Sequence, residues 1–564
     1  MKKTSLALLS RRDLILGATA SASLAATPLR AQSVKPSLPF ADLRETPAQI
    51  TAFAGLDNAR PLTRSGSEWR AGDLVVTLDN SRTGTVVSLA APSVAVTHLR
   101  LRWSLRYPED IVVLGDAWER SYGDLGWRNV VAERPLPWYC AVHQNGTTHC
   151  YGVETGAASL GMWQVDTAGI TLWLDVRNGG EGVLLGSRVL KAATLVARRG
   201  DRGESIHSAL SAFCRTMCPS PRLPKTTVYG SNDWYYAYGK NTAEGILRDA
   251  ELVAALAPSN GPKPFAIVDD GWQNQQTFPD MAALTAQIRS KGARPGLWIR
   301  PLQAHAGTDP KLLLPDVRFG RRRERFNDLA YDPTIPEARE AALNTMREAV
   351  RWGNDLVKHD FSTYELFGGW GSEMGASMTT GGWHFNDRSL TNAEIVLNLY
   401  RGLREAAGEQ TVVIGCNTIG HLAAGLFEAN RTGDDVSGRA WERTRRMGVN
   451  TLAFRLPQNR ALFIVDADCV PLTKAIAWEK TRIWLDVVAR SGTTLIVSPE
   501  PGAIGAEQKA ALREAFAIAA TTPAATADDM LQSNAPERWT FQQNGGIKKA
   551  NYSWDEDGAS PFSI

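Results

Sequence analysis

From Thr226 onward, the chain repeats one pattern about eight times: a short strand rich in Val, Ile and Leu, then a loop, then an amphipathic helix. The predicted strands span residues 226–229, 264–268, 294–299, 355–358, 412–414, 426–429, 462–465 and 494–497. Predicted helices between them include residues 243–257, 281–291, 335–352, 392–407 and 476–488. About eight such units favour a closed (β/α)8, or TIM, barrel. An open doubly wound sheet is the alternative, but no GxGxxG phosphate loop follows any predicted strand.

The first part of the chain has a different pattern. Residues 40–200 consist of short runs of Val, Thr, Leu and aromatic residues, with Gly, Asn or Asp between the runs. The predicted strands are residues 74–78, 85–89, 94–103, 111–114, 130–132, 169–176 and 194–197. Their spacing is typical of an antiparallel β-sandwich. A predicted helix at 205–217 and a Pro-Ser-Pro linker at 219–221 then lead into the barrel.

The N-terminus carries the features of an export signal. Two lysines precede the pair Arg11-Arg12, a short apolar stretch at 14–26 follows, and Ala31 offers a cleavage site. The stretch is too short for a spanning helix, which needs about 20 apolar residues, so we expect no membrane span. We therefore expect a twin-arginine signal and a periplasmic or secreted protein. The predicted domains are the signal at 1–31, an N-terminal β-sandwich at 32–222, the barrel at 223–519 and a C-terminal β segment at 520–564, which has room for two or three strands and whose abrupt end suggests an incomplete domain.

Composition excludes several classes of protein. The chain is 43% hydrophobic, which excludes a disordered protein. Residues 1–31 hold five basic residues and one acidic residue, so without them the formal net charge falls from +3 to −1. No electrostatic footprint for nucleic acid remains. Six cysteines are too few for a disulfide framework, and no spacing resembles a zinc site. Cys140 and Cys150 bracket an Asn-Gly turn, so both could lie on one hairpin and pair in an oxidising periplasm, but structural or free thiols are the default expectation for the six cysteines.

Acidic and aromatic side chains gather where the predicted strands end. In a closed barrel, the carboxyl ends of the strands surround the active site. The residues there are Asn232, Trp234, Asp269, Asp270, Trp272, Trp298, Arg300, Lys358, Asp360, Cys416, Asn417, Arg431, Asp434, Asp435, Asp466 and Asp468. Indole rings stack on the apolar face of a pyranose, while carboxylates and Arg bind its hydroxyls. Paired carboxylates are also what glycoside cleavage requires.

These strand ends resemble those of the α-galactosidase (melibiase) clan. Phe265-Ala266-Ile267-Val268-Asp269-Asp270-Gly271-Trp272 looks like the clan's "DDGW" segment, and further matches in the clan's order fall at 230–234, 296–301, 356–361, 431–435 and 465–468. The segment at 431–435 is nearest to the raffinose-synthase-like branch. Asp233 departs from the pattern, because Ser is usual there. The resemblance covers roughly 226–500.

The resemblance implies a role for each matching residue. Asp360 matches the nucleophile and Asp434 the general acid/base, with Asp435 as a rival. The matching substrate-binding residues are Asp269, Asp270, Lys358, Arg431, Trp234, Trp272 and Trp298, and the same rim holds Arg300, Asp466 and Asp468. Lys358 lies two residues before Asp360 and therefore on the same side of the strand, where its charge would keep Asp360 ionised.

Simpler structural roles are the alternative for several of these residues. Asp269, Asp280 or Asp466 could cap a helix, and Trp298 could belong to the core. His359 is expected on the opposite side of its strand, in the core, while His421 lies in a Gly-rich loop with no assigned role. Three arginines in one predicted helix are expected on its solvated face: Arg443, Arg445 and Arg446.

We therefore expect an exported retaining glycoside hydrolase of the α-galactosidase type, without metal or cofactor. It would cleave terminal α-linked sugars of an oligosaccharide or glycan by double displacement. A galactosyl transglycosylase uses the same covalent intermediate and is the first alternative. A non-catalytic carbohydrate-binding protein is the second, and a sugar other than galactose is the third. The sequence leaves linkage and oligomeric state open.

Overall fold

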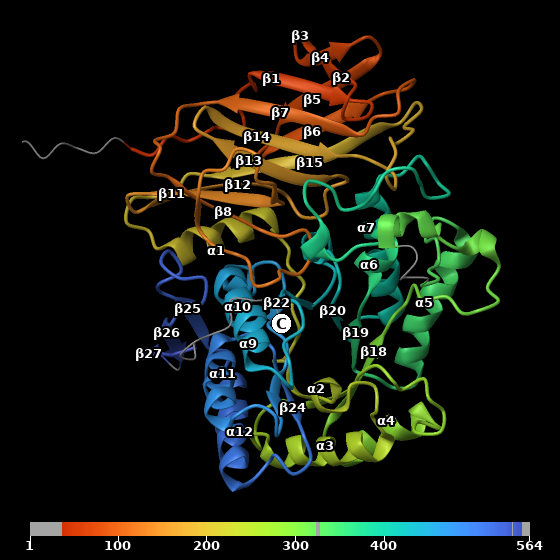
Figure 1. Ribbon diagram of the computed structural model, residues 1–564, viewed down its shortest axis with the longest axis vertical. Coiled ribbons are helices and arrows are strands. Elements are labelled where there is room, and N and C mark those ends of the chain that lie inside the picture. Colours follow the sequence, from red (N-terminus) through yellow and green to blue (C-terminus); the bar gives the residue numbers. More distant parts are fainter. Residues whose placement is uncertain (1–36, 323–327, 544, 555–564) are drawn as a thin grey trace, which may run out of the picture. The chain divides into compact units, whose positions relative to one another are not determined.

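A computed structural model describes residues 37–322, 328–543 and 545–554 of the protein (Figure 1). The predicted signal at 1–31 lies outside the described residues. The chain from Leu38 onward forms one compact unit. Within the described ranges, no helix is both long enough and apolar enough to cross a membrane.

The first fifteen strands form two antiparallel sheets, coloured red to yellow in Figure 1. One sheet has six strands in the order β10 (Leu136–Pro137), β13 (Leu160–Asp166), β14 (Gly169–Asp175), β7 (His98–Ser104), β1 (Gln49–Phe53) and β2 (Ala59–Pro61). The other has nine in the order β3 (Thr63–Ser65), β4 (Glu68–Ala71), β5 (Leu74–Asn80), β6 (Thr85–Ala90), β15 (Val189–Arg198), β12 (Thr147–Val153), β11 (Tyr139–Gln144), β8 (Val112–Gly115) and β9 (Arg128–Asn129). Burial alternates along β6, as expected for a strand with one face on a core.

Most predicted strands of this region agree with the structure. The run at 130–132 is not a strand, because the chain turns there: Arg134 donates its backbone N–H to the Val131 carbonyl, and the Val131 side chain is exposed. The predicted strand at 94–103 begins later, at His98.

The hairpin is present, and its two cysteines are free thiols, which agrees with the default expectation. β11 and β12 pair through the turn Asn145-Gly146, where both residues have positive φ, as a tight two-residue turn requires. The register pairs Cys140 with Tyr151 and Ala141 with Cys150. Since successive side chains alternate between faces, the two cysteines point to opposite sides of the sheet, and both thiols are free and buried.

The second part of the chain builds one parallel sheet of nine strands. After α1 (Ile206–Met217), the strands lie in the order β22 (Ile464–Asp466), β21 (Ala429–Arg431), β20 (Val412–Gly415), β19 (Leu356–His359), β18 (Arg294–Ile299), β17 (Phe265–Val268), β16 (Tyr229–Asn232), β24 (Leu495–Pro499) and β23 (Val470–Leu472). Only three residues separate β22 from β23. The backbone N–H of Thr494, just before β24, also donates to the Val465 carbonyl of β22 at 3.0 Å, so the chain before β24 contacts β22.

Helices surround these strands in Figure 1. They are α2 (Trp234–Ala237), α3 (Ala243–Leu256), α4 (Met281–Ser290), α5 (Pro336–Arg351), α6 (Ser362–Phe367), α7 (Asn392–Ala407), α8 (Gly420–Ala423), α9 (Trp441–Arg443), α10 (Asn450–Arg455), α11 (Trp478–Ser491) and α12 (Ala506–Ala519). A π-helical turn, Thr444–Val449, joins α9 to α10. α7 begins with a capping box, in which Thr391 and Glu394 satisfy each other's backbone N–H groups.

A separate apolar cluster lies between the parallel strands. It includes Phe265 and Ile267 of β17, Ile414 of β20, Ile464 of β22 and Ile496 of β24. The predicted strands agree with the observed ones except for small shifts; β16 begins three residues later than expected. At Gly230, φ is +150° and a Cβ would lie 1.9 Å from the Phe265 carbonyl oxygen, so only glycine fits this close strand contact.

The end of the chain adds a small antiparallel sheet. It contains β25 (Ala524–Ala527), β26 (Arg538–Gln543) and β27 (Gly546–Asn551), consistent with the two or three strands expected.

Candidate active site

Asp360 follows the last residue of β19 and is held in one orientation by three hydrogen bonds. Its Oδ2 accepts from Trp298 Nε1 at 2.9 Å, and its Oδ1 accepts from the backbone N–H groups of Phe361 and Asn417 at 2.7 and 2.9 Å. Burial alone would raise the pKa of this carboxyl. The positive charges of Arg120 and Lys358, with the hydrogen bonds from Trp298 and Phe361, outweigh burial, so the pKa of Asp360 lies below its ordinary value. Asp360 is therefore a buried, ionised and oriented carboxylate.

Lys358 also connects Asp360 to the end of β17. Its Nζ lies 2.8 Å from Asp269 Oδ2, which also accepts from Asn232 Nδ2 at 2.7 Å. Asp233, the departure from the family pattern, accepts the Asp269 backbone N–H at 2.9 Å. Burial and the nearby Asp269 raise the pKa of Asp233 to about 8. Asp269 is thus a buried side chain in a charged pair, and its carboxylate caps no described helix.

Asp434 is fixed from two sides by arginines. Its Oδ1 lies 3.0 Å from Arg120 Nη2, and its Oδ2 lies 2.6 Å from Arg443 Nη2. Its backbone N–H donates to the Ser121 carbonyl at 2.8 Å, and Ser121 N–H donates to the Thr432 carbonyl at 2.9 Å. The segment after β8 in the N-terminal sheets therefore pairs like a short strand with the segment that carries Asp434.

The same segment reaches Asp360 by a second route. Glu119, which is fully buried, accepts from Asn417 Nδ2, and the Asn417 backbone in turn donates to Asp360. Arg455 of α10 holds the segment in place: it pairs with Asp116 at 2.7 Å and donates to the Glu119 carbonyl at 2.7 Å. A loop of the N-terminal sheets thus positions both candidate catalytic carboxylates.

Arg431 at the end of β21 gathers three acids. Its guanidinium lies 3.3 Å from Asp435 Oδ1, 3.3 Å from Asp466 Oδ2 and 2.7 Å from Asp468 Oδ1. Asp468 also accepts from the Tyr235 hydroxyl, and burial raises its pKa despite the charge of Arg431. Asp435 is the most open of these acids, with 41% of its side chain exposed.

The candidate catalytic acids share a cavity of about 570 Å³. Its lining residues are Arg120, Tyr122, Asp360, Phe361, Trp370, Ser372, Asp434, Asp435, Arg443, Arg446 and Met447. Only the three acids were predicted from the sequence as site residues. The other predicted residues do not line it; among them, Lys358 and Arg431 connect to the lining through Asp360 and Asp435.

The aromatic residues form a layer around Asp360. Trp298 is buried, and its backbone carbonyl accepts from Trp272 Nε1 at 2.8 Å. Phe361 lines the cavity in a left-handed backbone conformation, with φ of 66°, which is strained for a large side chain. Arg300 lies 4.3 Å from the centre of the Phe361 ring and pairs with buried Glu365 at 2.6 Å. Arg300 therefore supports the Phe361 ring.

Two predicted residues lie at the edge of this arrangement. Trp234 is half-buried and packs against Tyr238, with ring centres 5.5 Å apart. Asp270 accepts from the Gly271 backbone N–H at 2.9 Å and from Gln273 Nε2 at 3.1 Å. Its carboxylate therefore stabilises the loop in this structure.

The structure corrects the expectation for the arginine helix. Arg443 and Arg446 line the cavity, and Arg443 pairs with Asp434; Arg445 pairs with Glu442. In sequence, a charged helix that lines a polar cavity cannot be told from one that faces solvent. Only the tertiary fold shows that one side of this helix faces a cavity. His359 is a core residue as expected, packed against Tyr400 and Phe427. Asp280 caps α4 by accepting the Ala283 N–H.

Missed residues of the site come mainly from the loop after β8. Glu119, Arg120 and Tyr122 lie more than 200 positions before Asp360, in a region predicted only as part of a sandwich. No motif or periodicity marked them. Trp370 lies beside Tyr364, with stacked rings 4.4 Å apart, in a loop that the sequence left unassigned.

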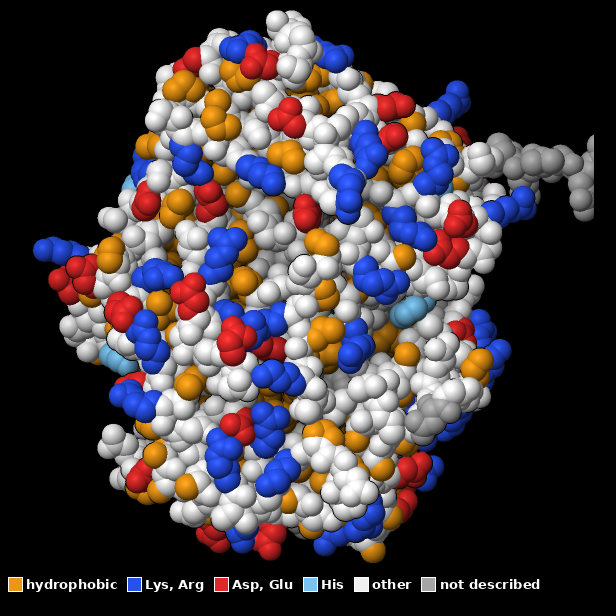
Figure 2. All heavy atoms as spheres, turned by 180° about the vertical axis from the view of Figure 1, so that it is seen from behind, with side chains coloured by type: hydrophobic (Ala, Val, Ile, Leu, Met, Phe, Trp, Pro, Cys, Tyr) orange, Lys and Arg blue, Asp and Glu red, His pale blue; other side chains and the backbone are white. Residues whose placement is uncertain are grey.

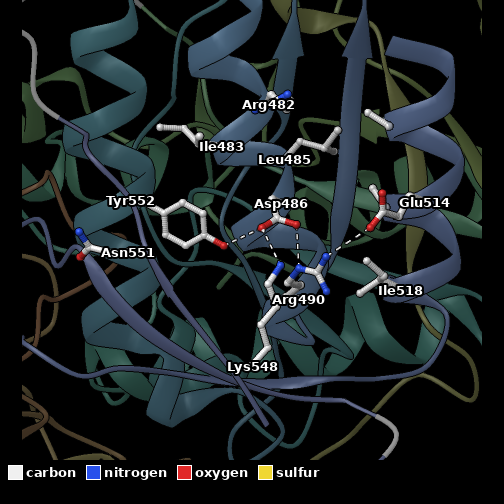
Figure 3. Close-up of a pocket in the computed structure, with 12 residues that line it drawn as sticks. Arg482, Ile483, Leu485, Asp486, Arg490, Glu514, Ile518, Lys548, Asn551 and Tyr552 are labelled. Atoms are coloured by element: carbon white, nitrogen blue, oxygen red, sulfur yellow. Dashed lines mark hydrogen bonds and ion pairs between the residues drawn. The ribbon is translucent and has the colours of Figure 1, made fainter. Parts of the chain in front are cut away.

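A second cavity, of about 480 Å³, lies between α11, α12 and β27 (Figure 3). Several of its charged groups are paired with one another: Asp486 contacts Arg490 at 2.7 Å and the Tyr552 hydroxyl at 2.7 Å, and Arg490 contacts Glu514 at 3.4 Å. None of the predicted site residues lines it.

In the described ranges, no three or more His, Cys, Asp and Glu side chains are grouped to hold a metal ion. Figure 2 shows basic and acidic side chains interspersed over one face of the molecule.

Neither a protein-family model nor a curated protein matches the sequence. Solved structures do match. The α-galactosidase TtGalA from Thermus thermophilus, solved with p-nitrophenyl α-D-galactopyranoside, is 20% identical; the match covers 86% of this chain and 99% of that one, with a TM-score of 0.57. The GH36 α-galactosidase AgaB from Geobacillus stearothermophilus is 13% identical, with 83% and 70% covered and a TM-score of 0.55. An α-galactosidase from Lactobacillus brevis is 12% identical, with 88% and 74% covered and a TM-score of 0.53.

These matches extend over the N-terminal sheets and the parallel sheet together, since they cover more than four fifths of the chain. They confirm, for the fold, the resemblance to α-galactosidases noted in the strand ends. The raffinose-synthase-like branch stays a prediction. The chain therefore has the fold of the GH36 α-galactosidases.

Proposed function

We propose that this protein is an exported retaining glycoside hydrolase that acts on α-galactosides. The observation that carries the proposal is the cavity in which an ionised, oriented Asp360 lies with Asp434. Solved proteins of the same fold support the choice of sugar: TtGalA was solved with stachyose, and AgaA from Geobacillus stearothermophilus with raffinose. We further propose that the nine parallel strands form a closed eight-stranded barrel, in which β22 and β23 are halves of one strand.

In the first step, an Asp360 oxygen attacks the anomeric carbon and forms a glycosyl ester. The bond from that carbon to the leaving oxygen breaks, and Asp434 gives its proton to the departing oxygen. The hydrogen bonds from Trp298 and from the Phe361 and Asn417 backbones hold the attacking carboxylate in place. In the second step, Asp434 takes a proton from water, the water oxygen bonds to the anomeric carbon, and Asp360 leaves as a carboxylate. The product retains the α-configuration.

The proton donor is Asp434 rather than Asp435 in this proposal. Asp434 is more enclosed, with 14% of its side chain exposed against 41% for Asp435. Arg120 and Arg443 pair with Asp434 and fix its orientation. Formation of the glycosyl ester removes the charge of Asp360 and returns Asp434 to the role of base.

We assign the charged residues that the sequence predicts at the strand ends to the sugar hydroxyls. Asp269 with Lys358, and Arg431 with its three acids, form preorganised polar groups at the strand ends. Trp298 and Trp272 supply the apolar walls. The mutual pairing of these groups keeps each charge satisfied before a sugar arrives.

Three variants test the mechanism. Asp360→Gly should abolish hydrolysis of an activated α-galactoside, and added azide should restore turnover and give a β-galactosyl azide. Asp434→Ala should spare substrates with good leaving groups and lose activity on poor ones, because only the latter need a proton. Asp435→Ala is the matched control and should lower both rates equally. If Asp435→Ala shows the leaving-group dependence and Asp434→Ala does not, the acid is Asp435; if azide gives the α-azide, Asp360 is not the nucleophile.

A further inference from the structure

Arg446 differs from the other arginines of the cavity. Arg120 pairs with Asp434 and Asp435, and Arg443 pairs with Asp434. Arg446 lines the same cavity, is half-buried, and makes no ion pair or side-chain hydrogen bond with any residue that the structure describes. A guanidinium placed in a binding cavity without a carboxylate partner is suited to bind an anion from a ligand.

The local backbone presents this side chain to the cavity. Arg446 belongs to the π-helical turn between α9 and α10, an irregularity that is frequent at functional sites. Thr444, Gly448 and Val449 of the turn are buried, and a Cβ at Gly448 would lie 2.8 Å from the Trp484 ring. With that side packed against α11, Arg446 and Met447 face the cavity.

The position of Arg446 relates it to one end of the substrate. Arg443, three residues earlier in the same helical segment, contacts Asp434, the proposed proton donor. A proton donor lies beside the leaving oxygen, so this segment borders the leaving-group side of the bond that is cleaved. Ser372 and Tyr122, which line the same cavity, add hydroxyl groups to its wall.

The charges of the residues that line the cavity also indicate an anionic ligand. Three arginines and three aspartates line the cavity, and one aspartate carries a proton when substrate binds in the proposed mechanism. The lining residues of the occupied cavity then hold one positive charge in excess. A neutral galactoside leaves that charge without a partner, whereas an anionic group on the leaving sugar balances it.

We propose that Arg446 recognises an anionic substituent, a uronate carboxylate or a sulfate ester, on the sugar or group that leaves. This inference rests on the proposed function, because it takes the leaving-group side from Asp434. The natural substrate is then an acidic α-galactoside rather than a neutral oligosaccharide.

The test uses three aryl α-galactosides whose leaving groups differ in charge. The aglycones are 4-nitrophenol, 3-carboxy-4-nitrophenol and 4-nitro-3-sulfophenol, the last standing in for a sulfate ester. We expect kcat/KM of the full chain to be at least about tenfold higher for one or both anionic compounds, as a charged hydrogen bond allows. Arg446→Gln should remove this preference, and 0.5 M NaCl should weaken it. Arg445→Gln is the matched control, because Arg445 lies one residue away and pairs with Glu442 outside the lining; it should keep the preference.

The outcomes separate the two proposals. A higher kcat/KM for the carboxylated compound alone, or for the sulfonated compound alone, supports the inference and identifies the anion. A higher kcat/KM for both compounds also supports it. Equal kcat/KM for all three compounds in the wild type, or a preference that survives Arg446→Gln, overturns it while leaving the glycosidase intact. If no compound is hydrolysed, the proposed function fails, and calorimetric titration of the same compounds decides the inference. Tighter binding of the anionic compounds, lost in Arg446→Gln, supports the inference. Equal binding of all three compounds overturns it.

Discussion

Arg120 is the residue whose removal tests most fully how this site works. It comes from the N-terminal sheets, is 6% exposed, and lies 3.0 Å from Asp434 and 3.3 Å from Asp435. It is also the first of the charges that lower the pKa of Asp360 against the effect of burial. Arg120→Gln keeps a hydrogen-bonding group of similar shape and removes the charge.

The expected effect has two parts. Loss of the charged hydrogen bond to Asp434 should cost about 1.5–3 kcal/mol, which lowers kcat/KM roughly tenfold to a hundredfold at the optimum pH. The pair with Asp435 is discounted, since 41% of that side chain is exposed to solvent. The pKa of Asp360 should rise without Arg120. Because the nucleophile must be ionised, the acid limb of the pH profile of kcat/KM should move to higher pH.

The assay is the pH profile of kcat/KM for 4-nitrophenyl α-galactoside, with circular dichroism to show that the variant is folded. Arg443→Gln is the matched control, because it also removes a guanidinium from Asp434, while the charges that most lower the pKa of Asp360 come from Arg120 and Lys358. An acid limb that stays in place for Arg120→Gln, or moves equally in both variants, would refute this account of how Asp360 is kept ionised.

Three further predictions concern export, sugar binding and stability. Replacing Arg11 and Arg12 with Lys should leave the precursor inside the cell, and normal export in a fractionation assay would contradict the twin-arginine signal. Asp270→Asn should lower kcat/KM roughly tenfold to a hundredfold if the carboxylate binds a hydroxyl, while an unchanged value would assign it to the loop contacts seen here. Burial raises the pKa of Glu365 to about 8, above the 4.5 of an exposed group. Between pH 4.5 and 8 the native state therefore binds more protons than the unfolded state, and the free energy of unfolding falls as pH rises through that range. The free energy of unfolding in urea should therefore be more favourable to Glu365→Gln, relative to wild type, at pH 9 than at pH 4. An equal difference between the two proteins at both pH values would contradict this.

The sequence was informative where chemistry and local pattern coincide. Asp360, Lys358 and Arg431 follow or end buried strands, and parallel strands bring their carboxyl ends to one edge, so their proximity could be predicted. Helix α7 was also predicted with its observed bounds, from its amphipathic pattern alone.

The rest depends on contacts between distant segments. Arg120 enters the site only because Ser121 pairs with the backbone beside Asp434, more than 300 residues away, and no local pattern encodes that pairing. The orientation of Arg446 depends on a π-helical turn that no residue type specifies. The cysteines of the β11–β12 hairpin show the same limit, since a shift of one residue in register decides whether two side chains share a face.

Proton NMR during the first minutes of α-galactoside hydrolysis tests the central claim most directly. Asp360 as nucleophile and Asp434 as acid/base require two inversions at the anomeric carbon. The account predicts that the first galactose released is the α-anomer, with the β-anomer growing only at the rate of spontaneous mutarotation. Initial release of β-galactose would contradict the double displacement and the roles assigned to both residues.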